Sequence, residues 1–338
     1  MDRQEKQAMW DAINAGKPID RHVALAILRA SHGELAEILH AAHKVTSLRF
    51  GKEVSLCSIA NVRSGNCSED CSFCAQSSHF KGVPAPTYPL MSTEQIKECA
   101  EKGGKAPLEY FSYVTSGRAL EGKSLSRVCE AVSEMEADKQ EISSGGLNSA
   151  DGNFKHCASL GCLSFESLKK LKESGVSRYH HNLEAAESFF PAVCTTHSYS
   201  ERIETVRNAK KAGLEVCCGG LLGLGESLEQ RVELAVAIAT EQVDSIPLNF
   251  LVPIPGTPME NNTPLEPLEI LLSIAMFRLV NPHSEVRMAA GRGSLRSLQS
   301  FIFHAGCNGL MVGDFLTVSG QGLENDLTML RDLGLTVK

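Results

Sequence analysis

The chain is poor in aromatic residues and has no excess of positive charge, and these two shortages exclude one class of partner. Phe, Tyr and Trp make up 6% of its 338 residues, and its formal net charge is −7. Proteins that bind nucleic acid present basic surfaces to the phosphate backbone. The composition therefore gives no electrostatic footprint for nucleic acid.

Long apolar runs are missing as well. No stretch approaches the ~18 consecutive apolar residues that a membrane-spanning helix needs. The N-terminus from Met1 to Lys6 is charged and leads into no apolar signal segment. We therefore expect a cytoplasmic protein that makes no use of a membrane. In a reducing cytosol, its 12 cysteines would be metal ligands, catalytic groups or small buried residues instead of disulfides.

Three cysteines are crowded into one short run, in which Cys67, Cys71 and Cys74 form a C-x3-C-x2-C pattern. This spacing is too tight for one regular helix or strand, so it predicts a loop that turns three thiolates toward one point. Iron–sulfur clusters are held by cysteines presented in this way. Three ligands for a four-iron cube leave one iron open to something other than protein. A structural zinc loop is the alternative, but zinc usually takes four protein ligands, often as two close pairs, and no second C-x2-C pair follows.

Short apolar segments alternate with amphipathic ones along most of the chain. Strands are predicted at Val54–Asn61, Tyr110–Thr115, His156–Leu160, Ser177–Asn182, Leu214–Leu222, Val243–Leu251, Glu285–Ala290 and Gly309–Val312. Helices are predicted at Leu125–Ala137, Phe165–Ser174, Ser200–Ala212, Leu228–Thr240, Leu268–Leu279 and Leu295–Ala305.

This alternation predicts an α/β fold, a (β/α)8 TIM-type barrel over residues 46–338 with an N-terminal helical extension over residues 1–45. An open doubly wound sheet would give much the same local pattern. Barrel active sites lie at the C-terminal ends of the strands. The cysteine run directly follows the first predicted strand, which is where that rule expects a site.

Two further strand ends carry unusual residues. The glycine-rich run from Gly219 to Glu226 closes the fifth predicted strand and would let backbone approach a flat ligand, although no Lys-Ser/Thr pair follows to make it a phosphate-binding loop. At the end of the fourth strand, His180, Asn182 and Glu184 share one face because strand side chains alternate. The adjacent histidines 180 and 181 cannot easily share one metal ion for the same reason.

The remaining cysteines divide by position. Cys157 and Cys217 fall inside predicted strands, and Cys194 follows the fourth strand. Strand parity sends only one of Cys217 and Cys218 into a barrel. Singly, each is more often a buried small residue than a ligand. Together with Arg287 in the seventh strand, they could line a second cluster.

The cysteine run resembles the signature of radical S-adenosylmethionine enzymes. The resemblance implies that the open iron of a 4Fe–4S cluster on Cys67, Cys71 and Cys74 chelates S-adenosylmethionine and cleaves it to a 5′-deoxyadenosyl radical. It implies that Phe73 lies beside the adenine. Gly219, Leu221, Gly223 and Glu226 match the superfamily's G-x-I-x-G-x-x-E element, whose backbone meets the adenine. Asn182 and Glu184 would meet the ribose and the ammonium group, with Ser116 as a further cofactor contact.

From about Lys44 onward the chain resembles the biotin synthase family. The matching runs are Ser64–Cys67, His181–Glu184, Thr195–Tyr199, Cys217–Gly220, Pro247–Phe250, Gly256–Pro258 and Val286–Arg292. The resemblance implies sulfur insertion into dethiobiotin after two hydrogen abstractions, with the sulfur delivered by an auxiliary cluster. It also implies that Asn249 and Asn182 hydrogen-bond the substrate's ureido ring.

The chain departs from the best-known form of the family at the auxiliary cluster. That form holds a 2Fe–2S cluster with three cysteines and one arginine, and Cys157, Cys217 and Arg287 match three of these positions. Ser112 stands at the fourth, and a hydroxyl is a poor substitute for a thiolate on iron. Cys194 is an added cysteine. We therefore expect Cys157, Cys194 and Cys217 to bind a four-iron cluster with an extra sulfide, with Arg287 close by and Cys218 as the reserve ligand. A 2Fe–2S cluster ligated by Ser112 is the alternative. A second departure is Glu184, which replaces the family's aspartate.

Other functions remain open at this point. A related radical enzyme of the same barrel family, such as a hydrogenase-cofactor maturase or an amino-acid mutase, is the nearest alternative. A non-enzymatic iron–sulfur carrier is another, although a carrier does not need a glycine-rich adenine platform. For a biotin synthase we expect a flavodoxin- or ferredoxin-type electron donor and a homodimer. The roles of Cys162 and Cys218 are not fixed by the sequence.

Overall fold

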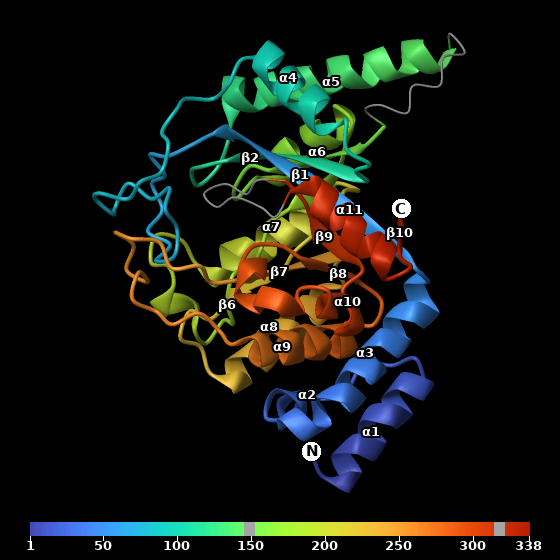
Figure 1. Cartoon of the computed structure of the whole chain (residues 1–338). Coiled ribbons are helices and arrows are strands. Elements are labelled where there is room, and N and C mark those ends of the chain that lie inside the picture. The colour runs from blue at the N-terminus through green and yellow to red at the C-terminus, as the bar shows by residue number, and fades with distance from the viewer. Residues whose placement is uncertain (145–152, 314–321) are drawn as a thin grey trace.

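The computed structural model describes residues 1–144, 153–313 and 322–338. Its centre is a closed barrel of parallel strands (Figure 1). Neighbouring strands follow one another in the order β1, β2, β3, β4, β5, β7, β8 and β9, and β9 pairs back onto β1. This closure confirms the (β/α)8 barrel, and the open-sheet alternative is wrong. The strands are β1 (Glu53–Arg63), β2 (Tyr110–Thr115), β3 (Lys155–Ser159), β4 (Val176–His180), β5 (Glu215–Cys217), β6 (Gly220–Leu222), β7 (Ser245–Phe250), β8 (Glu285–Met288), β9 (Gly309–Met311) and β10 (Thr336–Val337).

Helices surround the barrel and extend the N-terminus. The α-helices are α1 (Arg3–Asn14), α2 (Arg21–Leu28), α3 (Leu35–Phe50), α4 (Thr93–Gly103), α5 (Gly122–Ser144), α6 (Phe165–Glu173), α7 (Tyr199–Lys211), α8 (Leu228–Glu241), α9 (Pro267–Val280), α10 (Phe301–His304) and α11 (Leu323–Asp332), and the 3₁₀ turns are η1 (His32–Glu34), η2 (Phe190–Ala192) and η3 (Arg292–Leu298). None of the described helices is both long and apolar enough to cross a membrane.

The N-terminal helices pack against the outside of the barrel. α2 and α3 both contact α9, whose residues from Ile270 to Val280 are all buried. A helix that is apolar all round is buried on all sides, and α9 lies between the strands and these N-terminal helices. The predicted boundary between residues 45 and 46 falls inside α3, and the division into an extension and a barrel stays a prediction.

Several segments differ from the expected pattern. The predicted fifth strand is two strands, β5 and β6, because Gly219 turns its amide to the side chain of Asn182 (3.0 Å). The helix predicted at Leu295–Ala305 is not continuous: its first part belongs to η3, which is kinked at Arg296 (φ 53°), and α10 is a separate short helix. The sequence reading also omitted α4, α11 and β10.

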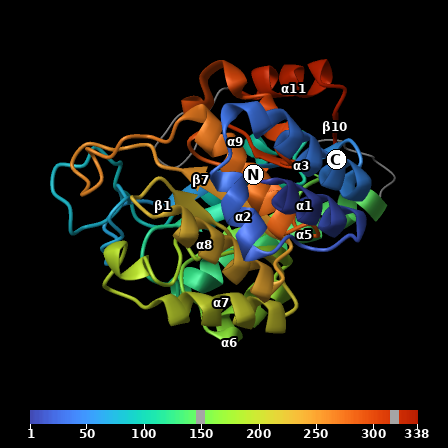
Figure 2. The ribbon, with the colours of Figure 1, turned by 90° about the horizontal axis from the view of Figure 1, so that it is seen from below.

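Two loops from opposite halves of the chain lie on the same side of the barrel. The loop after β1 and the loop after β7 project together at the left of Figures 1 and 2, away from the N-terminal helices. They touch each other, since a Cβ on Gly256 would lie 3.2 Å from Val83. Both loops follow the C-terminal ends of their strands, where barrel active sites form.

Candidate active site

The cysteine loop opens onto a cavity of about 390 Å³ inside the barrel mouth. Cys67, Cys71 and Cys74 all line this cavity, as the spacing predicts. The loop turns on its own backbone, because the Cys74 N–H donates to the Cys71 carbonyl (2.9 Å) and the Ser78 N–H to the Cys67 carbonyl (2.8 Å). Burial raises the pKa of the Cys74 thiol to about 11. Metal binding would have to displace that proton, because thiolates are the ligands.

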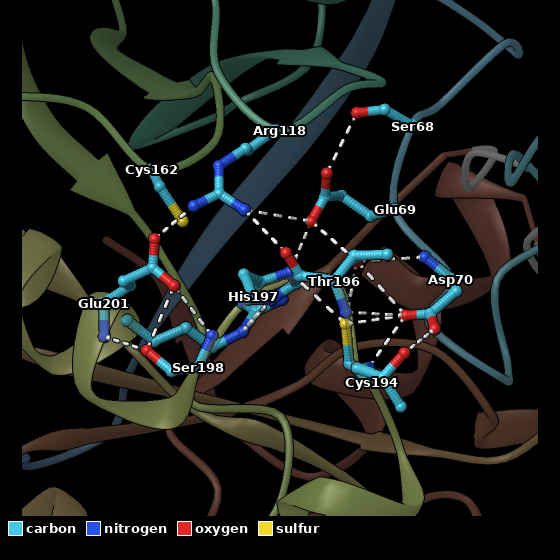
Figure 3. A network of polar contacts seen from close by, with 12 residues as sticks. Ser68, Glu69, Asp70, Arg118, Cys162, Cys194, Thr196, His197, Ser198 and Glu201 are labelled. Carbon is cyan, nitrogen blue, oxygen red and sulfur yellow. Dashed lines mark hydrogen bonds and ion pairs between the residues drawn. The ribbon is translucent and has the colours of Figure 1, made fainter.

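A second segment, residues 194–198, holds the cysteine loop from the side (Figure 3). The Asp70 carboxylate accepts the backbone N–H groups of Thr195 (2.9 Å) and Thr196 (3.2 Å). Burial acts to raise the pKa of Asp70, but hydrogen bonds from the Thr195 hydroxyl and from these backbone N–H groups hold that pKa well below its usual range. Glu69 pairs with His197 at 2.6 Å. We call residues 194–198 the clamp segment.

Cys194 belongs to this clamp segment. Its thiol lies 3.2 Å from the Asp70 carboxylate and 3.3 Å from His197 Nδ1. The ligand atoms of Cys71, Cys194 and His197 lie within 4.8 Å of one another, and this group contains neither Cys157 nor Cys217. Among the described residues, the structure therefore brings Cys194 to the cysteine loop and does not gather it with the two strand cysteines.

The glycine-rich run and Phe73 meet at the cavity wall. Phe73 packs against a buried apolar cluster that includes Leu221. Gly219 is required by packing, because a Cβ there would lie 1.9 Å from the Pro247 carbonyl oxygen of the neighbouring strand. Gly223 has a left-handed φ of 90°, and the Glu226 carboxylate accepts its N–H (2.9 Å). Glu226 therefore fixes the turn that presents Leu221 to the cavity.

The segment at and after the end of β4 faces the cavity, but not through strand alternation: β4 ends at His180, Glu184 has a positive φ of 66°, and His181 lines the cavity as well. His180, Asn182 and Glu184 all line the cavity. The Asn182 side chain accepts the Gly219 N–H and lies 3.3 Å from Glu184. Glu184 also lies 3.7 Å from the Arg202 guanidinium, so part of its charge is already balanced.

The two adjacent histidines contact different cysteines. His180 Nδ1 lies 3.4 Å from Cys217 Sγ, whereas His181 Nε2 lies 3.8 Å from Cys162 Sγ. The two imidazole rings therefore have different partners.

Asn249 and Ser116 line the cavity and also connect backbone segments. The Asn249 amide donates to the Gly220 carbonyl (3.2 Å) and accepts the Ala290 N–H (3.1 Å). Ser116 donates to the Gly65 carbonyl at 2.7 Å, next to the cysteine loop.

The barrel strands contribute a second group of thiols deeper in the same cavity. Cys157 and Cys217 both line it, and burial, together with the neighbouring Cys217, raises the pKa of Cys157 to about 12. Cys218 packs instead into the main hydrophobic core, so the parity argument for this pair is confirmed. Arg287 lines the cavity but turns its guanidinium to Ser55, Leu310 and Glu285.

Comparison with known proteins decides the family. Residues 61–238 match the Radical SAM superfamily model, and residues 247–336 match the Biotin and Thiamin Synthesis associated domain. A biotin synthase of Maridesulfovibrio salexigens is 75% identical over 338 residues, covering 100% of this chain and 99% of that protein. The chain belongs to the biotin synthase family.

More distant relatives agree with this membership. A biotin synthase of Geobacter sulfurreducens is 44% identical, with 98% of this chain and 97% of that protein covered. Among solved structures, a methylornithine synthase gives a TM-score of 0.79 at 20% identity, covering 98% of this chain and 97% of that one. A maturase of the [FeFe]-hydrogenase gives 0.82 at 14% identity, covering 100% of this chain and 76% of that one. At these identities the structural likeness shows the fold alone.

The residues present fit the iron–sulfur chemistry of the biotin synthase family. Two groups of thiols face one cavity, and none of the 12 cysteines is in a disulfide.

Sequence reasoning missed Cys57, Arg178 and the roles of Asp70 and His197. Cys57 had a usable signal, since strand alternation puts it on the same face as Ser55 and Ile59 of the first predicted strand.

Proposed function

We propose that this chain inserts sulfur into dethiobiotin to form biotin, with both the radical chemistry and the sulfur source in one barrel cavity. The observation that carries this proposal is the shared cavity: the three loop thiols and two strand thiols all line it. When bound, the clusters and S-adenosylmethionine supply the 5′-deoxyadenosyl radical and the sulfur atom. The protein's own part is to bind, orient and exclude water.

Cys67, Cys71 and Cys74 would hold the 4Fe–4S cluster. Phe73 and Leu221 would form an apolar surface for the adenine, with the Gly219 and Gly223 backbone beside it. Asn182, Glu184 and Ser116 would contact the polar parts of S-adenosylmethionine. The support is that Phe73 and Leu221 pack in one cluster, and that the three polar residues line the cavity.

Asn249, with Asn182, would hydrogen-bond the ureido ring of dethiobiotin. An amide side chain offers two donor hydrogens and an acceptor oxygen with two lone pairs. Each end of the Asn249 amide uses one of these on the backbone, which leaves one donor and one acceptor for a ring that contains N–H and C=O. Its place on the cavity wall supports this pose.

Cys157 and Cys217 would hold the auxiliary cluster, with Arg287 nearby. A four-iron cluster with an extra sulfide is favoured over a 2Fe–2S cluster, because Ser112 supplies a hydroxyl where the best-known form supplies a thiolate. Family membership also supports a flavodoxin- or ferredoxin-type electron donor, a homodimer and a cytoplasmic location for this chain.

Replacing Cys67, Cys71 and Cys74 together with Ala tests the radical half of the proposal. The variant should release no 5′-deoxyadenosine when the reduced protein is incubated anaerobically with S-adenosylmethionine, because no thiolate remains to hold the cluster. Iron analysis should still find the auxiliary cluster. The matched control replaces Cys99 and Cys129, which lie in outer helices α4 and α5, and should cleave S-adenosylmethionine normally. Undiminished cleavage by the triple variant would contradict the assignment.

A further inference from the structure

The inner wall of the cavity contains a cysteine that neither the motifs nor the resemblance assigned. Cys57 lies in β1, is 8% exposed and lines the same cavity as Cys157 and Cys217. It packs with Cys157 and Tyr110 in a small buried cluster of its own. Two of the strand cysteines thus belong to one buried cluster inside the barrel, on strands that β2 separates.

Strand register explains why Cys57 can stand in for the residue at position 112. In the β1–β2 pair, Cys57 lies opposite Tyr110 and Ile59 lies opposite Ser112. Side chains two residues apart on a strand point to the same side, so Cys57 faces the interior one step below Ser112. Ser112 in turn lies opposite Cys157 in the β2–β3 pair. A thiol at position 57 therefore reaches the same region that a thiol at position 112 would reach.

The charges around Cys57 suit an anionic ligand. Arg287 and Arg178 line the cavity with it, and the buried Glu285 carboxylate pairs with both guanidinium groups. Arg178 stacks on the Tyr110 ring at 3.6 Å, which holds it at this level of the barrel. These two cations, which Glu285 partly balances, reduce the cost of placing thiolates and sulfides in a low-dielectric interior.

Arg287 is itself badly placed to bind iron. Its Nη1 donates to the carbonyl oxygens of Ser55 and Leu310, and its Nη2 donates to Ser55 Oγ and Glu285. Turning either terminal nitrogen to a metal would leave buried acceptors without partners, which is unfavourable in a buried site. Arg287 therefore contributes charge, and a cluster at this depth needs a third protein ligand from elsewhere.

We propose that Cys57 is the third thiolate ligand of the auxiliary cluster, together with Cys157 and Cys217. This inference rests on the proposed function and replaces Cys194 in the ligand set, since Cys194 lies with Cys71 and His197. Cys57 supplies from β1 the thiolate that Ser112 does not supply from β2. Sulfur ligands suit iron–sulfur clusters, whereas a hydroxyl competes poorly.

The test measures iron, sulfide and Mössbauer spectra of anaerobically reconstituted full-length protein. Cys57→Ala and Cys157→Ala should each lose the auxiliary spectral component and keep the radical cluster with its S-adenosylmethionine cleavage. Cys194→Ala and Cys129→Ala, the latter in outer helix α5, should keep the auxiliary component. If Cys57→Ala does not fold, Cys57→Ser replaces it, because serine leaves no internal void; it should also lose the auxiliary component.

A rescue experiment separates ligation from packing. Adding Ser112→Cys to Cys57→Ala should restore auxiliary iron, because it returns a thiolate from the neighbouring strand. A residue with a merely structural role would not be rescued in this way. An unchanged auxiliary component in both Cys57 variants would overturn the inference. If Cys157→Ala also kept that component, the proposed auxiliary site would itself be wrong, and the two failures are thereby distinguished.

Discussion

Asn249 shows how one side chain joins structure and recognition. Its amide connects β6 to the segment after β8 while facing the cavity. Such a residue is held in place before any ligand arrives, which limits the entropy lost on binding.

We predict that Asn249→Ala weakens dethiobiotin binding roughly tenfold to a hundredfold, as expected for about 1–3 kcal/mol lost with one buried pairing. S-adenosylmethionine binding should change much less. Equilibrium binding of both ligands to the same protein preparation checks this. Unchanged dethiobiotin affinity, or an equal loss for both ligands, would count against direct contact.

The cysteines show which residue roles a sequence can reveal. The loop thiols and the Cys217/Cys218 pair were predictable because their geometry is local: a tight spacing in one case, strand alternation in the other. Cys194 lies in an irregular segment with no periodicity. Its position is fixed by a contact with Asp70, 124 residues away in the sequence, and no local pattern reports such a contact.

Among the structural elements, the cysteine loop depends most on a neighbour. It contains no regular helix or strand, and it is held to the clamp segment through Asp70 and Glu69. The Thr195–Tyr199 run, which resembles the family, thus has a structural role. It fixes the cysteine loop and also begins α7, whose N-cap is Ser198.

We predict that Asp70→Ala lets a chelator remove iron from the radical cluster several-fold faster than in the unchanged protein. The substitution removes the acceptor for two backbone N–H groups, and a lost hydrogen bond of this kind is worth about 1 kcal/mol. Asp70→Asn keeps one acceptor oxygen, so its rate of iron loss should lie between those of Asp70→Ala and the unchanged protein. The control is Asp138→Ala, since Asp138 is an exposed residue of α5, and this variant should lose iron at the same rate as the unchanged protein. Equal rates for all of these proteins would refute the clamp.

Element prediction succeeded where burial dictates pattern and failed where a single dihedral decides. Buried parallel strands read as short apolar runs, so all eight barrel positions were found. The helix predicted through Arg296 is interrupted by that residue's left-handed backbone, which no apolar spacing reports. For α4 a signal was present: Ser92 and Gln95 form a capping box at its start.

At the scale of the whole molecule, stability depends on histidines that the barrel keeps neutral. His156, in β3, is 1% exposed, and its Nδ1 lies 2.8 Å from the Tyr113 hydroxyl. Burial, helped by the charge of Lys139, lowers the pKa of His156 to about 4. Burial likewise lowers the pKa of His180 to about 4, so His156 is one of several groups acting in the same direction.

We predict that stability falls as the pH drops from about 6.5 to about 4, and that His156 accounts for a distinct part of the loss. Above this range the histidine is neutral in both folded and unfolded chains, so it has no effect. Within the range only the unfolded chain binds the proton, which favours unfolding. Moving the pKa of His156 from 6.5 to about 4 corresponds to about 3 kcal/mol at most.

Denaturant unfolding across this pH range should therefore give a shallower dependence of stability on pH for His156→Gln than for the unchanged protein. His283→Gln, at an exposed position, should keep the original slope. Parallel curves for His156→Gln and the unchanged protein would show that His156 is not held neutral by the fold.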